Sequence, residues 1–358
     1  MALAERLTDA VKKILVLAVA AVVTLLALPA PIGSNAWDPP RRPTLDGPLA
    51  VNQALRGADR LAAGQLVGPS GVVVDEVGRV TTGTLDGKIV RILPTAPLEV
   101  VTETGGRPLG LALSPNGELI VADGMKGLLR VDAEGHIEVL AHEAEGQALR
   151  FTRGVAVARD GTIYFTDASD RHGWHEQLTE VLAALPTGRL IRFEPSTRVA
   201  TVIARGLYMP GGVALAPDES YLVVAESSAY RLTRVWLTGD RRHLAEPFAD
   251  NLPGFPDGVS FSPRGTVWLA LPWTRSAAID FMHPLPFLKD SYAGLPELLR
   301  PRSAPHGLIV ELDGSGRPVR SFHDVGGALH RDVTSVLEDR GALLFGTATG
   351  TAVGSLPL

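Results

Sequence analysis

Five polar side chains each stand just ahead of, or at the start of, a short apolar stretch of the sequence. They are Ser70, Arg107, Arg153, Asp257 and Thr334. A guanidinium binds carboxylates and oxyanions, and a carboxylate can move a proton or hold a cation. If the fold brings these groups together, they form a polar site for a small molecule.

The sequence lacks the residues that several other kinds of chemistry require. There is no cysteine, which excludes disulfides, thiolate catalysis and sulfur-based zinc sites. No GxSxG turn, HExxH helix or Walker loop is present. The nine histidines are scattered rather than spaced as metal ligands, and we keep His306 as a candidate because it precedes a strand-like stretch.

The composition is that of a large folded chain without an excess of positive charge. Of 358 residues 45% are hydrophobic and 20% charged, and the net charge is -5. A nucleic-acid partner is therefore not expected. The 38 glycines and 27 prolines are spread along the chain, which favours many short β-strands joined by turns.

The elements that must position the polar residues form a repeat. Alternating apolar stretches separated by polar turns occur in six copies, with equivalent positions at Val72, Leu111, Val155, Val213, Val259 and Val336. The shortest interval between these positions is 39 residues, the size of one propeller blade. We predict an all-β, six-bladed β-propeller over residues 49–358, with a solenoid as the alternative. The loops that lead into the inner strands would converge at one mouth of a central channel.

Three segments stand outside the repeat. Residues 58–66 are expected to supply an outer strand to the last blade and so close the ring. Residues 176–185 have apolar positions at helical spacing and predict a short helix in blade three. Residues 277–299, in blade five, carry many apolar residues among prolines and predict a lid or a membrane-facing loop, or simply packing on the side of the ring.

The first 48 residues differ from the rest. Lys12 and Lys13 precede an apolar run from Ile14 to Leu28, so residues 1–36 predict an apolar helix that serves as an export signal or membrane anchor. The flanking lysines favour a propeller on the non-cytoplasmic side, membrane-anchored or secreted. Residues 37–48 are rich in proline and predict an extended spacer.

Several segments together resemble a known family. GRPLGLAL, FTRGVAV with IYFTDAS, GLYMPGGVALAPDESYLVVAES, NLPGFPDGVSFSPRGTVWLAL and VTSVLEDRGALLFGT occur in the order of the strictosidine synthase-like proteins, whose members include membrane-associated ones. The wider superfamily contains gluconolactonase-like and paraoxonase-like hydrolases. The resemblance implies a six-bladed propeller with calcium in its channel.

The implied calcium ligands are largely replaced. The hydrolases of the superfamily use one Glu, two Asn and one Asp, and the matching positions here hold Ser70, Arg153, Gly211 and Asp257, so only Asp257 remains. One carboxylate beside an arginine does not make a calcium site, and we expect no cofactor. Strictosidine synthase uses a glutamate where this chain has Thr334, so that particular condensation is not expected.

These replacements predict one specific contact and leave two functions open. The resemblance implies that the positions of Arg153 and Asp257 face the same ion, so we expect their side chains to meet across the channel. The first function is a lactone or ester hydrolase, with Asp257, Arg153, Arg107, Thr334 and His306 as candidate site residues. The alternative is a propeller that binds a small ligand, or acts as a scaffold, without turnover.

Overall fold

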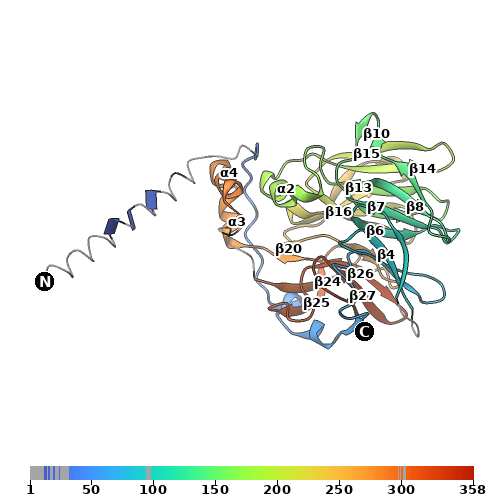
Figure 1. Cartoon of the computed structure of the whole chain (residues 1–358). Helices are drawn as coiled ribbons and strands as arrows, with labels where there is room; N and C mark the ends of the chain where they lie inside the picture. The colour runs from blue at the N-terminus through green and yellow to red at the C-terminus, as the bar shows by residue number, and fades with distance from the viewer. Residues whose placement is uncertain are drawn as a thin grey trace.

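The computed structural model describes residues 32–93, 98–296, 298, 300 and 304–358, together with residues 12, 13, 15, 16, 19, 20 and 24. The predicted N-terminal apolar helix falls for the most part outside the described residues. Within the described part of the chain, no helix has both the length and the apolar character needed to cross a membrane. Figure 1 shows the ring of β-sheets formed by the rest of the chain.

The repeat folds into six antiparallel four-stranded sheets, which confirms the predicted six-bladed propeller. Blade one comprises β2 (Val72–Val74), β3 (Val80–Gly83), β4 (Lys88–Ile92) and β5 (Glu99–Glu103). Blade two comprises β6 (Pro108–Leu113), β7 (Leu119–Asp123), β8 (Gly127–Val131) and β9 (Ile137–Ala141). Blade three comprises β12 (Thr152–Val157), β13 (Ile163–Asp167), β14 (Gly188–Glu194) and β15 (Val199–Leu207).

The second half of the ring continues the same order. Blade four comprises β16 (Pro210–Leu215), β17 (Tyr221–Glu226), β18 (Arg231–Trp236) and β19 (Ala245–Ala249). Blade five comprises β21 (Val259–Phe261), β22 (Val267–Ala270), β24 (His306–Leu312) and β25 (Pro318–Val325). Blade six comprises β26 (Val333–Asp339), β27 (Ala342–Thr347), β28 (Val353–Pro357) and β1 (Asp59–Leu61). Two small two-stranded sheets lie outside the blades: β10 (Glu143–Ala144) with β11 (Gln147–Ala148), and β20 (Gly254–Phe255) with β23 (Trp273–Thr274).

The ring is closed by an N-terminal strand. β1 pairs antiparallel with β28, with Asp59 opposite Ser355 and Leu61 opposite Val353. The prediction that residues near 58–66 complete the last blade is therefore confirmed. Closure gives β28 a partner and removes one exposed sheet edge.

The core consists of apolar layers between neighbouring blades. Each layer joins the facing sides of two consecutive sheets, and the layer between blade six and blade one contains Leu344 and Val353 from one side and Val72, Val80 and Val90 from the other. The remaining layers join blades one to six in turn. Alternation along the strands supplies these side chains, because successive residues of a strand face opposite sides of the sheet.

Helices are present in both predicted insertions. α2 (Gln177–Ala183) follows the 3-10 turn η3 (Trp174–Glu176) in blade three, and α3 (Ala277–Met282) and α4 (Pro286–Gly294) lie in blade five. α2 contacts α4, and Figure 1 shows the three helices together on one side of the propeller.

The predicted spacer is extended, but it is bound along the propeller rather than free. The backbone N–H of Trp37 donates to the carbonyl of His283 at 3.0 Å, and that of Asn35 donates to Ala183 at 3.1 Å. Further along, the short turns η1 (Gly47–Leu49) and η2 (Ala54–Gly57) lie against β25. We call residues 34–48 the strap.

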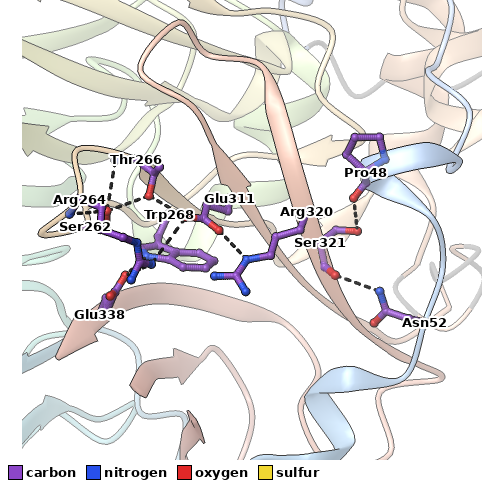
Figure 2. Close-up of polar contacts among 10 residues, drawn as sticks. All are labelled: Pro48, Asn52, Ser262, Arg264, Thr266, Trp268, Glu311, Arg320, Ser321 and Glu338. Carbon is purple, nitrogen blue, oxygen red and sulfur yellow. Dashed lines mark hydrogen bonds and ion pairs between the residues drawn. The ribbon is translucent and has the colours of Figure 1, made fainter. Parts of the chain in front are cut away.

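A polar network at the junction of blades five and six receives the end of the strap (Figure 2). The Ser321 hydroxyl donates to the carbonyl of Pro48 at 3.0 Å. Close by, Glu311 accepts from Thr266 and from Arg320, and the indole N–H of Trp268 donates to Glu338 at 2.8 Å. Both carboxylates lie at an interblade surface, and these donors satisfy them there.

Candidate functional site in the central channel

The inner strands approach closely around the axis because five of the six carry a glycine near their start. At each of these positions a Cβ atom would lie only 2.3 to 2.6 Å from a carbonyl oxygen of the next inner strand. Real side chains do not tolerate such a contact, so glycine is needed for the ring to close at this radius. The positions are Gly71, Gly110, Gly154, Gly212 and Gly258. The polar residues of the repeat stand within a few residues of these glycines.

The inner strands enclose a channel cavity of about 400 Å³. Ser70, Arg153, Asp257 and Thr334 line it together with apolar residues of all six inner strands. Four of the polar positions singled out in the sequence therefore meet in one cavity. Their role in catalysis stays a prediction.

Arg153 and Asp257 meet across the channel. The Arg153 Nη2 donates to Asp257 Oδ1 at 2.8 Å, and the two side chains are 9% and 13% exposed. The contact expected between these two positions is thus present. Burial raises the pKa of Asp257, and the positive charge of Arg153 opposes that rise.

The surroundings of this pair orient the arginine. Arg153 Nη1 donates to Ser227 Oγ at 3.4 Å, and Ser227 in turn donates to the carbonyl of Pro256 at 2.7 Å. The guanidinium lies 5.3 Å from the centre of the Phe151 ring. The Asp257 Oδ2 atom has no hydrogen-bond partner among the described residues, so one carboxylate oxygen stays available in the channel.

The hydroxyl groups of Ser70 and Thr334 form one side of the channel, the hydroxyl side, and they bond to one another. Ser70 Oγ donates to Thr334 Oγ1 at 3.2 Å, and Thr334 Oγ1 lies 3.3 Å from the carbonyl of Ser70. A side chain at Gly211 would begin 2.7 Å from Asp257 Oδ1, so this glycine leaves room for the carboxylate.

These residues do not fit a calcium ion. Calcium takes six to eight oxygen ligands, whereas this part of the channel offers one carboxylate, already bonded to a cation, and two hydroxyls that bond to one another. Gly211 offers no side-chain ligand, and the Arg153 charge repels a divalent cation.

Arg107 lies beside the channel but is enclosed. Its side chain is 1% exposed, and its Nη1 donates to the carbonyl of Gly68 at 3.0 Å. Burial lowers its pKa to about 10, while Asp123, Asp86 and Asp257 act in the opposite direction. Arg107 is absent from the residues that line the channel cavity, and this differs from the expectation that both arginines converge in it.

An aromatic cluster closes over the mouth of the channel near Arg153 and Asp257. Phe151 and Phe255, each two residues before one member of the ion pair, pack with Tyr230 and with Trp174 and Ile279 of the two insertions. The Trp174 ring meets Phe151 edge-on at 5.9 Å, and Tyr230 meets Phe255 at 4.9 Å. The insertions of blades three and five therefore flank this mouth.

His306 does not belong to the channel. It begins β24, the third strand of blade five, and it lines a separate cavity of about 570 Å³ with Arg41, Arg42 and Arg275. The insertion between β22 and β24 places His306 away from the axis. Its Nε2 lies 2.9 Å from Nδ1 of His323. His306 therefore lies outside the candidate site, contrary to the expectation from the sequence.

Sequence reasoning missed Trp174 and Ser227. Trp174 lies in the turn before the predicted helix of blade three, and nothing in the repeat marks it. Ser227 immediately follows the YLVVAE strand of blade four, where no equivalent polar position in the other blades points to it. Phe151 was visible, since it opens the FTRG segment.

Comparison with known proteins shows the family to which the chain belongs. The strictosidine synthase family model matches residues 153–240, and the N-terminal model of strictosidine synthase-like proteins matches residues 47–92. Strictosidine synthase-like protein 6 of Arabidopsis thaliana is 33% identical over 290 residues, 77% of this chain and 76% of that protein. The adipocyte plasma membrane-associated protein of Rattus norvegicus is 32% identical over 362 residues, 93% and 96% of the two chains. The chain belongs to the strictosidine synthase-like family.

Solved structures agree on the fold. A gluconolactonase from Xanthomonas campestris superposes with a TM-score of 0.61 at 19% identity, covering 92% of this chain and 97% of that one. A calcium-binding regucalcin from Agrobacterium tumefaciens superposes with a TM-score of 0.57 at 15% identity, covering 81% and 90%. At such identities the likeness concerns the propeller fold alone.

Proposed function

We propose that the chain hydrolyses an ester or lactone bond of a small molecule in its central channel, without a metal ion. The observation that carries this proposal is the ion pair of Arg153 and Asp257, nearly buried in a cavity of about 400 Å³. The gluconolactonase-like fold is consistent with it.

In this proposal Asp257 is the general base. Its Oδ2 atom takes a proton from a water molecule as the water oxygen bonds to the carbonyl carbon. Burial raises the pKa of this carboxyl and so makes the carboxylate a stronger base than an exposed one. The proton then passes to the leaving oxygen as the ester bond breaks, which yields an acid and an alcohol.

Arg153 stabilises the negative charge that develops on the carbonyl oxygen. Its N–H groups not used toward Asp257 and Ser227 can donate to that oxygen, from a side chain that is only 9% exposed. The hydroxyls of Ser70 and Thr334 on the hydroxyl side can bind other polar atoms of the substrate.

The test is turnover of a panel of aryl esters and lactones by the purified full chain. We expect Asp257→Asn to lower kcat/KM at least 100-fold, and EGTA to have no effect. Asp250→Asn is the matched control, because Asp250 is exposed. Full activity of Asp257→Asn, loss of activity in EGTA, or binding of panel compounds without turnover would each contradict the proposal.

We also propose that the N-terminal segment attaches the propeller to a membrane, with the propeller on the non-cytoplasmic side. The apolar run ends at Leu28, four residues before Ile32, and a chain of that length reaches at most about 14 Å. Ser34 donates to Asp290 of α4 at 3.0 Å, so the chain that follows the run lies against the blade-five insertion. Large apolar side chains of that insertion are exposed: Phe281 by 67%, Phe287 by 59% and Leu298 by 91%. A lipid surface at this place would cover them.

Single cysteines test the attachment, because the chain has none of its own. Val19→Cys and Phe287→Cys, each labelled with a fluorophore in full-length protein reconstituted in vesicles, should be quenched by nitroxide lipids. Val77→Cys, in an exposed turn of blade one, is the control and should be quenched only by aqueous quenchers. Equal aqueous quenching at all three positions would refute the attachment.

A further inference from the structure

Arg107 has an unused hydrogen-bonding edge. Only its Nη1 atom bonds, to the carbonyl of Gly68, while Nε and Nη2 are buried and have no partner among the described residues. The nearby carboxylate of Asp123 is already occupied by the backbone N–H of Arg107 and by Thr104. Buried donors are rarely left without a partner, so each such group calls for an explanation.

The two atoms without a partner, Nε and Nη2, form one edge of the planar guanidinium group. Nε and Nη2 carry parallel N–H bonds that match the two oxygens of a carboxylate in bidentate fashion. The carbonyl of Gly68 holds the opposite side of the group in place. The arginine is therefore oriented in advance for an anion that the protein itself does not supply.

Trp174 covers this arginine. The Arg107 guanidinium lies 5.2 Å from the centre of the Trp174 ring, and the same ring contacts Phe151, which in turn lies under Arg153. The two arginines therefore contact one pair of packed rings, Arg107 on Trp174 and Arg153 on Phe151.

The element that carries Trp174 is weakly held. Trp174 begins η3, a single 3-10 turn without a fully buried residue, in the insertion outside the blade. Turns of this kind open at low cost in free energy compared with core strands. The blade itself need not change when the ring turns away.

We propose that Arg107 is a carboxylate-binding subsite at the channel mouth, which a ligand reaches by displacing the Trp174 ring. The inference rests on the proposed channel function and gives its substrate class: an ester or lactone that bears a carboxylate. The acyl group lies at Arg153 and Asp257, and the carboxylate lies on Nε and Nη2 of Arg107.

The experiment measures binding without turnover, so it does not depend on hydrolysis. Benzoate and its neutral isostere benzamide are titrated by calorimetry into the full chain. In Trp174→Ala, where no ring must be displaced, we expect benzoate to bind at least tenfold more tightly than in the unmodified protein and at least tenfold more tightly than benzamide. Adding Arg107→Gln to Trp174→Ala should abolish the preference for benzoate.

Two controls keep the outcome decisive. Arg317→Gln in the Trp174→Ala background removes an 81% exposed arginine and should leave the preference intact. Circular dichroism checks that each variant is folded, and if the Arg107→Gln double variant is not, the Trp174→Ala result decides alone. Equal affinity of Trp174→Ala for benzoate and benzamide, or a preference that survives Arg107→Gln, overturns the subsite. If the subsite is confirmed but the ester panel shows no turnover, the hydrolase proposal fails and the subsite stands.

Discussion

At the scale of single residues, the centre of this propeller is organised by an internal cation. Arg153 supplies a positive charge to Asp257 at 2.8 Å, in a channel that lacks the ligands for calcium. An arginine differs from a metal ion in that it is tethered and directional, so it leaves the second carboxylate oxygen free. In the proposed hydrolysis, this arrangement takes the place of a metal ion.

The ion pair leads to a prediction about calcium. Arg153→Asn leaves a nearly buried carboxylate without its cation, and we expect a loss of about 3 kcal/mol in the free energy of unfolding, measured with urea. The triple variant Ser70→Glu, Arg153→Asn and Gly211→Asn should gain a calcium-dependent rise in Tm, because ligands that bind only the folded state stabilise it.

The unmodified protein is the reference for this prediction. Its Tm should not respond to millimolar calcium. A calcium-dependent rise in the unmodified protein, equal to that of the triple variant, would show that Arg153 does not replace the ion.

At the scale of elements, the strap and the blade-five insertion form one unit. Arg275, whose side chain is 1% exposed, pairs with Asp280 of α3 at 3.1 Å and donates to the carbonyl of Pro40 and to Asn251 at 2.7 Å each. Its guanidinium also lies 4.3 Å from the centre of the Tyr230 ring. One side chain thus holds the strap, α3 and the loop after blade four together beside the channel mouth.

Removing that side chain should loosen the strap. Arg275→Met leaves Asp280 without its partner and several acceptors unpaired, and we expect it to cost about 3 kcal/mol of stability and to admit a protease within residues 34–48. Limited proteolysis with mass spectrometry locates the cuts. Arg317→Met is the control, since an exposed ion pair contributes at most about 1 kcal/mol. A strap that stays protected in Arg275→Met would mean that its other contacts suffice.

At the scale of the whole molecule, stability depends on ring closure by a strand from the other end of the chain. β1 and β28 are separated by almost the full length of the propeller in sequence, yet they pair side by side. A chain that begins at residue 32 keeps the strap and β1, and we expect a single cooperative urea transition. A chain that begins at residue 63 lacks β1 and leaves β28 as an open edge, so its midpoint should fall and it should tend to aggregate.

Comparing the urea unfolding of the two truncated chains shows whether β1 stabilises the propeller by closing the ring. If both unfold at the same urea concentration, β1 contributes nothing to the ring. If the chain from residue 32 loses cooperativity, the residues before it belong to the core, contrary to the predicted domain division.

Buried histidines make the folded molecule sensitive to acid. Burial lowers the pKa of His283 to about 3 and that of His323 to about 4, below the usual value of about 6.5. The unfolded chain therefore takes up protons first as the pH falls, so stability present above pH 6.5 is lost progressively between about pH 6.5 and 4 for His323 and between about pH 6.5 and 3 for His283. Asp257 and Glu180 act in the opposite sense, since burial raises the pKa of each.

A matched pair of variants isolates the histidine contribution. His283→Phe keeps an aromatic ring against Trp37 but cannot bind a proton, so the urea midpoint should fall less steeply between pH 7 and 4 than in the unmodified protein. His142→Phe, at an exposed side chain, should leave the slope unchanged. The same slope in His283→Phe and the unmodified protein would refute this account.

The sequence by itself determined the ring and the polar residues at its axis. Alternation and turns are local signals that repeat six times, and a glycine near the head of the inner strand accompanies five of the repeats, so the six blades and the positions of Arg153 and Asp257 could be predicted. The closing strand followed from the incomplete last blade. The apolar insertions were recognisable because they interrupt the repeat.

Only the tertiary structure decided how the irregular parts meet the ring. Arg153 and Asp257 bond across 104 residues of sequence, and the distance and exposure of the pair depend on the packing of blades between them. Trp174 over Arg107, the strap along α3 and α4, and His306 in a separate cavity all come from insertions that carry no repeat. Their positions follow from long-range burial and from unpaired polar groups that must find partners, and neither leaves a periodic pattern along the chain.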